Sequence, residues 1–387
     1  MAKAIESSVK PSVLKWARET SGASVEEAAR RLGVPAPTFA KWETVESSLK
    51  LGQLRALAAY FKRPLAALLL PDPPAEPPLP TDFRTLPGRR RTFDRGTRLA
   101  IRKAIRLRSV ARDLMQALQR EAAAVIGGSH ISENPQTAAE RERQRLGLSI
   151  ETQFEWKNPY QAFRTWRATL ESRNVLVFQL PMRVEDARGF SLSDEEPFTI
   201  VVSSSDAVQA RIFSLFHEYA HLLLREPGIC LPQPDLRGRG PHAEVEQWCN
   251  GFSAALLVPA AALRSVSVSK GPIQSEERLF EAIREGETRF RVSQQVVLRR
   301  LLDVGLVSKP SFQRAMKRLL SQQPARKAGG GRIEPAKKCL AENGHLFTSL
   351  VLEGRARGMI NFSDVADYLG LRLKYLREVE SDVAAAA

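Results

Sequence analysis

The sequence lacks any long hydrophobic run. None of its stretches approaches the roughly 20 apolar residues that a membrane-spanning helix needs. The first residues also lack an apolar signal core and include an early acid, Glu6. We therefore expect a cytoplasmic protein without membrane association.

Cysteine is scarce, and the chain has only Cys230, Cys249 and Cys339. The three are scattered, their number is odd, and none forms a Cys-x-x-Cys pair. We therefore expect neither a disulfide framework nor a zinc site built from cysteines. No segment repeats at the spacing of solenoid or propeller folds, so those architectures are not expected either.

Acidic residues are outnumbered. The chain has 43 Asp and Glu against 58 Lys and Arg, and its net charge is +15. A strongly basic chain favours polyanionic partners, nucleic acid first. The length of 387 residues exceeds one typical hydrophobic core, so two or three domains are expected.

Strand candidates are few. Residues 175–180 and 198–202 are β-branched and aromatic runs typical of strands. Most of the remaining chain shows helical spacing of its apolar residues. We therefore predict an α+β fold that is mainly α with a small β-sheet.

Prolines mark the clearest domain boundary. Short helices are predicted over residues 12–70, including one that Ser24 and Glu27 cap and Gly33 ends. Residues 71–80 are so rich in proline that they predict an extended spacer. A basic stretch from Arg84 to Arg108 follows, and a helix is expected from Thr97 to Ile126. We predict four divisions. They are an N-terminal domain over 1–70, a proline-rich and basic linker over 71–96, a central domain over 97–265 and a C-terminal helical region over 266–387.

One predicted helix, over residues 208–225, carries two histidines four positions apart. Residues at that spacing lie on one face, so His217 and His221 can present two imidazoles to one metal ion, and Zn²⁺ accepts them in tetrahedral geometry. Glu218 projects beside the metal, where it can take a proton from water and pass it to a leaving amine. Burying these polar groups in an otherwise apolar helix without a role would be costly. The pattern therefore predicts a zinc-dependent peptidase.

A hydrolytic zinc site needs a third protein ligand and one open position. The helix predicted over residues 244–257 offers Glu246, which we prefer because it lies one turn before Asn250 on a helix whose apolar residues can pack inward. Glu244 and His242 stay open as alternatives. Two histidines and a carboxylate also suit Mn²⁺ or Fe²⁺.

The residues around these helices resemble the ImmA/IrrE metallo-endopeptidases. The resemblance implies a zincin-like core in which two histidines and a downstream glutamate bind zinc and the glutamate between the histidines is catalytic. On this chain those roles fall to His217, His221 and Glu246 as ligands, and to Glu218. The matching segments are 175–180, 189–192, 200–202, 213–224 and 246–259.

The N-terminal helices resemble the Xre/Cro-type helix-turn-helix that often precedes this peptidase. Residues 41–43, 62–65 and 82–84 are the matching pieces. A helix-turn-helix places its second helix in the major groove, which makes Thr38 and Lys41 candidate DNA contacts.

Two further segments remain open to more than one interpretation. The basic stretch from Arg84 to Arg108 can add phosphate contacts, or it can be a solvated basic helix. The helix-turn-helix can also dock a protein. The tail from Gly354 to Leu369 resembles the helical end of long family members.

The resemblance implies an intracellular zinc endopeptidase that cleaves an Xre-type transcriptional repressor and so relieves repression in a stress or mobile-element response. An edge strand near residues 198–202 is expected to hold the substrate backbone extended. The alternative is a DNA-binding regulator or antitoxin-like protein with a weak or idle metal site. A third hypothesis is a metal-sensing repressor.

Overall fold

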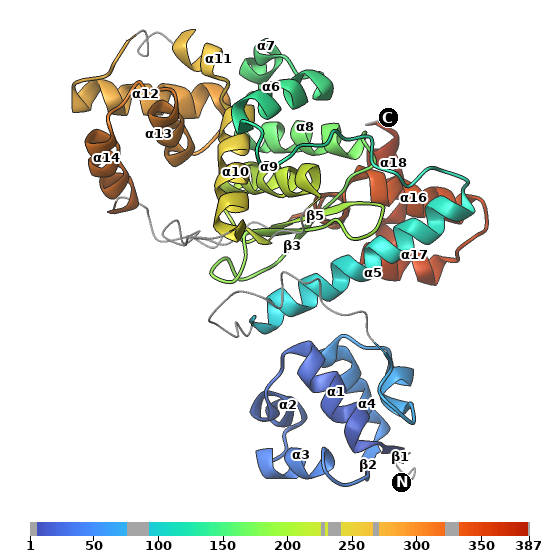
Figure 1. Ribbon diagram of the computed structural model, residues 1–387. Coiled ribbons are helices and arrows are strands. Elements are labelled where there is room, and N and C mark those ends of the chain that lie inside the picture. The colour runs from blue at the N-terminus through green and yellow to red at the C-terminus, as the bar shows by residue number, and fades with distance from the viewer. Residues whose placement is uncertain are drawn as a thin grey trace. The chain divides into compact units, whose positions relative to one another are not determined.

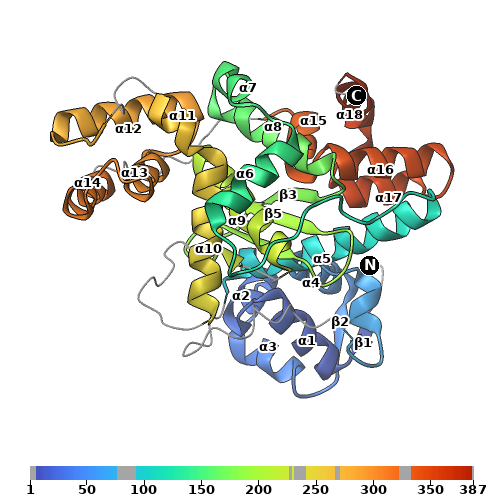
Figure 2. The same ribbon diagram turned by 45° about the horizontal axis from the view of Figure 1, so that its top comes forward.

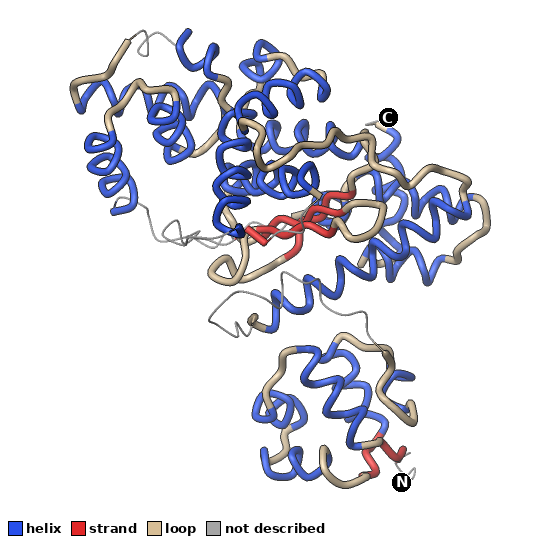
Figure 3. Tube along the Cα trace, viewed as in Figure 1, coloured by secondary structure: helices blue, strands red, loops and turns tan. Residues whose placement is uncertain are grey.

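The computed structural model describes residues 6–75, 93–225, 229–230, 241–265, 271–321 and 333–385. Helices dominate and the strands are short (Figure 3), which confirms the prediction of a mainly α protein with a small β-sheet. The chain forms two compact units, Met1–Lys103 and Ala104–Ala387. Most of the proline-rich and basic linker, including Arg84 and residues 82–84, lies outside the described residues.

The N-terminal unit is a small helical bundle with one two-stranded sheet (Figure 1). The short helices predicted over residues 12–70 are present, and the one that Ser24 caps ends at Leu32, before Gly33. The two short antiparallel strands, which pair the start of the unit with the segment before α4, were missed, because four-residue strands carry too few side chains for an alternating pattern to stand out. Its elements are β1 (Glu6–Val9), α1 (Pro11–Ser21), α2 (Val25–Leu32), α3 (Ala36–Trp42), β2 (Ser47–Lys50), α4 (Leu51–Phe61) and the 3₁₀ helix η1 (Leu65–Leu69).

Local sequence explains the turn between α2 and α3. Ser24 accepts a hydrogen bond from the backbone of Glu27, whose carboxylate accepts one from Ser24 in return, which is the predicted capping box. Gly33 ends α2 with a φ of 69°, a left-handed conformation that costs glycine little. Phe39 then anchors α3 in the core with no exposed surface.

Part of the basic stretch forms hydrogen bonds within the N-terminal unit. Helix α5 (Arg95–Ala117) begins there, and the unit boundary falls inside it. Arg98 donates to the carbonyl of Glu19 at 3.2 Å, and Arg102 donates to the carbonyl of Lys62 at 3.1 Å. These arginines therefore satisfy carbonyls at the ends of α1 and α4. The predicted helix to Ile126 is too long, since α5 ends at Ala117.

The second unit places helices around a four-stranded sheet of order β3-β5-β4-β6. Strand β5 pairs in parallel with β3 on one side and antiparallel with β4 on the other. The expectation that the segment near residues 198–202 is an edge strand is therefore wrong. It is an interior strand, since it pairs with a neighbour on each side. The sequence could not show this, because every residue of the strand is buried and a fully buried strand carries no signal of its place in the sheet. The strands are β3 (Leu176–Leu180), β4 (Gly189–Leu192), β5 (Thr199–Ser203) and β6 (Ile229–Cys230).

The helices of this unit form the core and two flanking groups. Helix α9 packs against β4, β5, α8 and α10, and its aromatic contacts include Phe216 against Trp166 at 4.7 Å between ring centroids. Helices α12–α14 and helices α15–α18 lie on opposite sides of the sheet in both views (Figures 1 and 2). The helices are α6 (Pro135–Leu146), α7 (Ile150–Glu155), α8 (Pro159–Glu171), α9 (Val208–Leu224), α10 (Pro241–Leu257), α11 (Ala260–Ser265), α12 (Glu276–Phe290), α13 (Gln294–Asp303), α14 (Lys309–Ser321), α15 (Pro335–Asn343), α16 (His345–Ala356), α17 (Phe362–Leu369), η4 (Leu373–Tyr375) and α18 (Leu376–Ala384).

A buried ion pair on α8 ties the C-terminal helices to the core. Arg167 bonds Glu171 at 2.9 Å and donates to the carbonyl of Ala341 at the end of α15. Glu171 accepts the backbone N–H of His345 at 3.0 Å, at the start of α16. The cation thus meets a helix C-terminus and the anion meets an N-terminus, which suits both helix dipoles. The glycine run 329–331 before these helices lies outside the described residues.

Candidate metal centre

Helices α9 and α10 pack against each other inside the apolar core, and polar residues of both helices meet at their contact. His217 and His221 are each 1% exposed and Glu246 is 8% exposed. Three ionisable groups gathered at this depth need one another or a shared ligand, because burying such groups alone is costly.

The ligand atoms of these side chains converge. The Nε2 atom of His217 lies 3.2 Å from Glu246 Oε2, and the Nε2 atom of His221 lies 3.3 Å from Glu246 Oε1. The two imidazole Nε2 atoms are 3.3 Å apart. All three residues can therefore hold one metal ion between them.

The structure separates the three candidates for the third ligand. Glu246 faces the histidines, whereas Glu244, two residues earlier on α10, is exposed to solvent. The side chain of His242 lies outside the described residues. Among the side chains that the structure describes, the geometry thus brings Glu246 to the pair.

The charges at the centre are coupled. Burial opposes protonation of His217, but hydrogen bonding and the charge of Glu246 outweigh it and raise the pKa of this histidine. Burial also favours a neutral Glu246, yet its hydrogen bonds to both histidines hold the pKa of this carboxyl well below its ordinary range. In the absence of metal, the carboxylate is therefore the anionic partner of the imidazoles.

Glu218 lies between the two histidines in sequence and is fully buried. Its side chain lies against strand β4 at Gly189. A Cβ atom on that glycine would lie 3.3 Å from both Cγ and Oε1 of Glu218 and 2.9 Å from the carbonyl oxygen of Val201. Only a residue without a side chain leaves this space open, so Gly189 helps to define where the carboxylate sits.

Asn250 orients one of the histidines. Its Oδ1 atom lies 3.1 Å from His217 Nδ1. An amide oxygen only accepts hydrogen bonds, so Nδ1 carries the hydrogen and the lone pair of Nε2 points to the centre. Our sequence reasoning missed the roles of Asn250 and Gly189. The one-turn spacing from Glu246 is the signal that identifies Asn250, since it places both side chains on one face of α10.

Tyr219, the residue after Glu218, has different surroundings. Tyr219 is 1% exposed and donates to the Glu142 carboxylate at 3.0 Å, within the core beside α6. Its burial and the charge of Glu142 raise the pKa of the phenol. The side chain thus packs in the core and bonds Glu142 on α6.

The candidate DNA contacts lie on α3 of the N-terminal unit. Lys41 is exposed and Thr38 is half-buried, while their neighbour Phe39 fills the core. Arg18 on α1 bonds Glu43, the residue that follows α3, at 2.6 Å and so fixes the end of this helix. Helix α3 therefore exposes a short polar surface, while Phe39 on its other face packs in the core.

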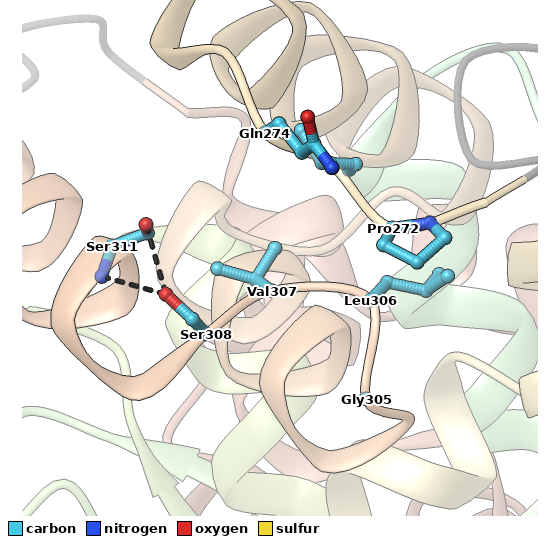
Figure 4. A pocket seen from close by; sticks show the side chains of 8 residues that line it. Pro272, Gln274, Gly305, Leu306, Val307, Ser308 and Ser311 are labelled. Carbon is cyan, nitrogen blue, oxygen red and sulfur yellow. Dashed lines mark hydrogen bonds between the residues drawn. The ribbon is translucent and has the colours of Figure 1, made fainter.

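A pocket of about 410 Å³ lies elsewhere, at the start of α12 and the turn between α13 and α14 (Figure 4). Apolar and small polar groups line it, and its two serines bond each other at 3.0 Å between Ser308 Oγ and Ser311 Oγ. It contains no titratable or metal-ligating side chain among its lining residues. It therefore offers none of the chemistry that the metal centre offers.

The chain combines an N-terminal helical domain with a candidate metal centre of two histidines and a glutamate later in the sequence. Comparison with protein families agrees. Residues 170–302 match the IrrE N-terminal-like domain of peptidase family M78, and residues 12–69 match a helix-turn-helix domain. The chain thus has the architecture of ImmA/IrrE proteins with an N-terminal helix-turn-helix. No curated protein and no solved structure matches the chain. Among the described helices, none has the length and apolar character needed to cross a membrane.

Proposed function

We propose that the protein is a zinc-dependent endopeptidase and that its substrate is an Xre-type transcriptional repressor. The observation that carries the proposal is the convergence of His217, His221 and Glu246 in the core. A second support is the match of this region to a peptidase family.

The donor set favours zinc. A tetrahedral ion with ligand bonds of about 2.0–2.1 Å has its ligand atoms about 3.3–3.4 Å apart. The nearest separations between the three side chains, 3.2, 3.3 and 3.3 Å, are of that size, with Glu246 facing His217 through Oε2 and His221 through Oε1. Two imidazoles and a carboxylate also leave one position for water or substrate, as a hydrolytic site requires.

The protein side chains then have distinct tasks. Zinc, when bound, supplies a Lewis acid that polarises a peptide carbonyl and acidifies water. Glu218 takes a proton from the attacking water and gives it to the leaving amine. Asn250 holds His217 in the tautomer that ligates through Nε2.

The resemblance to the ImmA/IrrE peptidases implies a repressor substrate, because the targets of that family are typically Xre-type repressors. The helix-turn-helix match at residues 12–69 is compatible with a domain that pairs with such a target. Cleavage would separate the DNA-binding part of the target from the rest and relieve repression, in a stress or mobile-element response.

The test compares the wild type with Glu218→Gln and His217→Ala. We expect about one zinc per chain in the first two and loss of zinc in the third. Cleavage of a proteome-derived peptide library, read as new N-termini by mass spectrometry, should occur only in the wild type, with a loss of at least 10²-fold in Glu218→Gln.

The same assay in cell extract identifies the protein substrate. A cleaved protein with a helix-turn-helix, present with wild type and absent with Glu218→Gln, supports the repressor part. Failure to bind zinc after it is supplied would overturn the peptidase proposal, and the basic chain with its helix-turn-helix would then favour a DNA-binding regulator.

A further inference from the structure

A second segment near the C-terminus repeats the pattern of the N-terminal helix-turn-helix. Residues 361–379 align with residues 24–42 without insertion or deletion. The alignment pairs capping residues, small or apolar core residues and the glycine of the turn. These pairs are Ser24 with Asn361, Glu27 with Asp364, Ala28 with Val365, Ala29 with Ala366, Leu32 with Leu369, Gly33 with Gly370, Val34 with Leu371 and Phe39 with Leu376.

The local structures agree in detail. Helices α2 and α17 both begin with a capping box and both end at a left-handed glycine, with φ values of 69° and 61°. In both turns, the N–H of the glycine donates to the carbonyl three positions earlier, and the next N–H donates to the carbonyl five positions earlier. The same backbone turn therefore leads from α2 into α3 and from α17 towards α18.

Both second helices bury a side chain at the same aligned position, although α3 packs on α2 whereas α18 packs on α15 and α16. Phe39 of α3 has no exposed surface, and its counterpart Leu376 at the start of α18 is 5% exposed. Val379, one turn later, is also fully buried, and α18 packs on α15 and α16. A buried side chain at this position turns the opposite face of the helix outward, as a helix-turn-helix requires.

The outward faces differ in charge. Arg372, Lys374 and Arg377 are all exposed, in the turn and at the start of the second helix. The N-terminal motif has Pro35, Pro37 and Ala40 at the three aligned positions. Helix α18 also carries acidic residues: Glu378 is exposed, Glu380 and Asp382 are half-buried, and Glu380 pairs with Arg355. The C-terminal motif thus has three cations where the N-terminal motif has none.

We propose that α17, η4 and α18 form a second helix-turn-helix, which binds duplex DNA by presenting Arg372, Lys374 and Arg377 to its phosphates. This segment lies outside both family matches. Duplex DNA is favoured as the partner because Arg372, Lys374 and Arg377 are long exposed cations of the kind that contact phosphates. Leu373, which is 44% exposed, lies between two of them. The proposal is independent of the metal centre.

The test uses the full-length protein and a fluorescein-labelled 30-base-pair duplex of mixed sequence, with affinity measured over a series of KCl concentrations. The variant Arg372→Ala/Lys374→Ala/Arg377→Ala is compared with Lys309→Ala/Arg314→Ala/Lys317→Ala. The control removes the same charge from exposed positions of α14. Each phosphate contact contributes about 0.9 to the slope of log affinity against log salt.

We expect the slope to fall by about two to three in the α18 variant and to stay near the wild-type value in the control. Circular dichroism should show both variants folded, since all six side chains are exposed. Equal slopes for the two variants would overturn the proposal, as would a wild-type protein that does not bind the duplex at 50 mM KCl. A loss of affinity in Lys41→Ala alone would assign DNA binding to the N-terminal motif instead.

Discussion

The proposed functional residues of the metal centre are buried, whereas those of the N-terminal helix-turn-helix lie at or near the surface. At the centre, the residues proposed to act are part of the core, and His217 is 1% exposed. On α3, Phe39 fills the core while Lys41 is exposed beside it. Function and packing are therefore coupled at the metal centre and separable in the helix-turn-helix. Substitutions in the two regions should differ accordingly.

The largest expected effect comes from His221→Ala, which removes one ligand atom from the converging set. We expect metal content to fall from about one per chain to near zero and peptide cleavage to be lost, because two remaining ligands hold the ion weakly. Metal analysis of the purified variant measures it. His130→Ala is the control, since His130 is exposed and lies outside the centre. Full metal content in His221→Ala would remove this residue from the ligand set.

The next effect tests whether packing at Gly189 controls the position of Glu218, the proposed general base. In Gly189→Ala, the added methyl group would lie 3.3 Å from the side chain of Glu218 and 2.9 Å from the carbonyl oxygen of Val201. We expect kcat to fall by less than the roughly 10²-fold that a 1 Å misplacement costs, while KM and metal content change little.

Gly286→Ala is the matched control for that change. Its added methyl group would lie 2.6 Å from a methyl carbon of Val297, so it also crowds the core, but between α12 and α13. Equal losses of kcat in both variants would mean that Gly189 acts through stability and not through Glu218.

Sequence reasoning selected candidate ligands that the structure brings together, and it could do so for a physical reason. A helix imposes its period on the chain, so the four-residue spacing of His217 and His221 already defines one face. Glu246 was preferred over its neighbours because of its position on a predicted helix, and the structure brings it to the histidines. The crossing of α9 and α10, which joins these faces, is a tertiary contact that no local pattern contains.

The misplaced edge strand illustrates the limit. Strand β5 is apolar on both faces, and the sequence 199–203 is compatible with an edge or an interior position. Both neighbours, β3 and β4, precede β5 in the sequence, and the order of the three strands depends on how the whole sheet assembles. The boundary of α5 was also beyond local reasoning, since residues 118–126 keep apolar spacing without remaining helical.

A smaller effect is expected from Asn250→Ala, which removes the acceptor of His217 Nδ1. Loss of such an orienting partner weakens metal affinity about 10–100-fold. Competition with a zinc chelator measures it. Asn250→Asp keeps an acceptor oxygen and should retain most of the affinity, whereas Gln247→Ala, at an exposed position of the same helix, should change nothing. Unaltered affinity in Asn250→Ala would show that packing alone orients the imidazole.

The smallest effect belongs to the helix-turn-helix. Lys41→Ala removes one exposed cation from α3, so the salt dependence of DNA affinity should fall by about one in slope if the lysine contacts a phosphate. Lys15→Ala removes the same charge from an exposed position of α1 and should leave the slope unchanged. Urea unfolding of both variants should match the wild type, because neither side chain belongs to the core. A marked loss of stability in Lys41→Ala would break the comparison, since function and packing would then be coupled on α3 as they are at the metal centre.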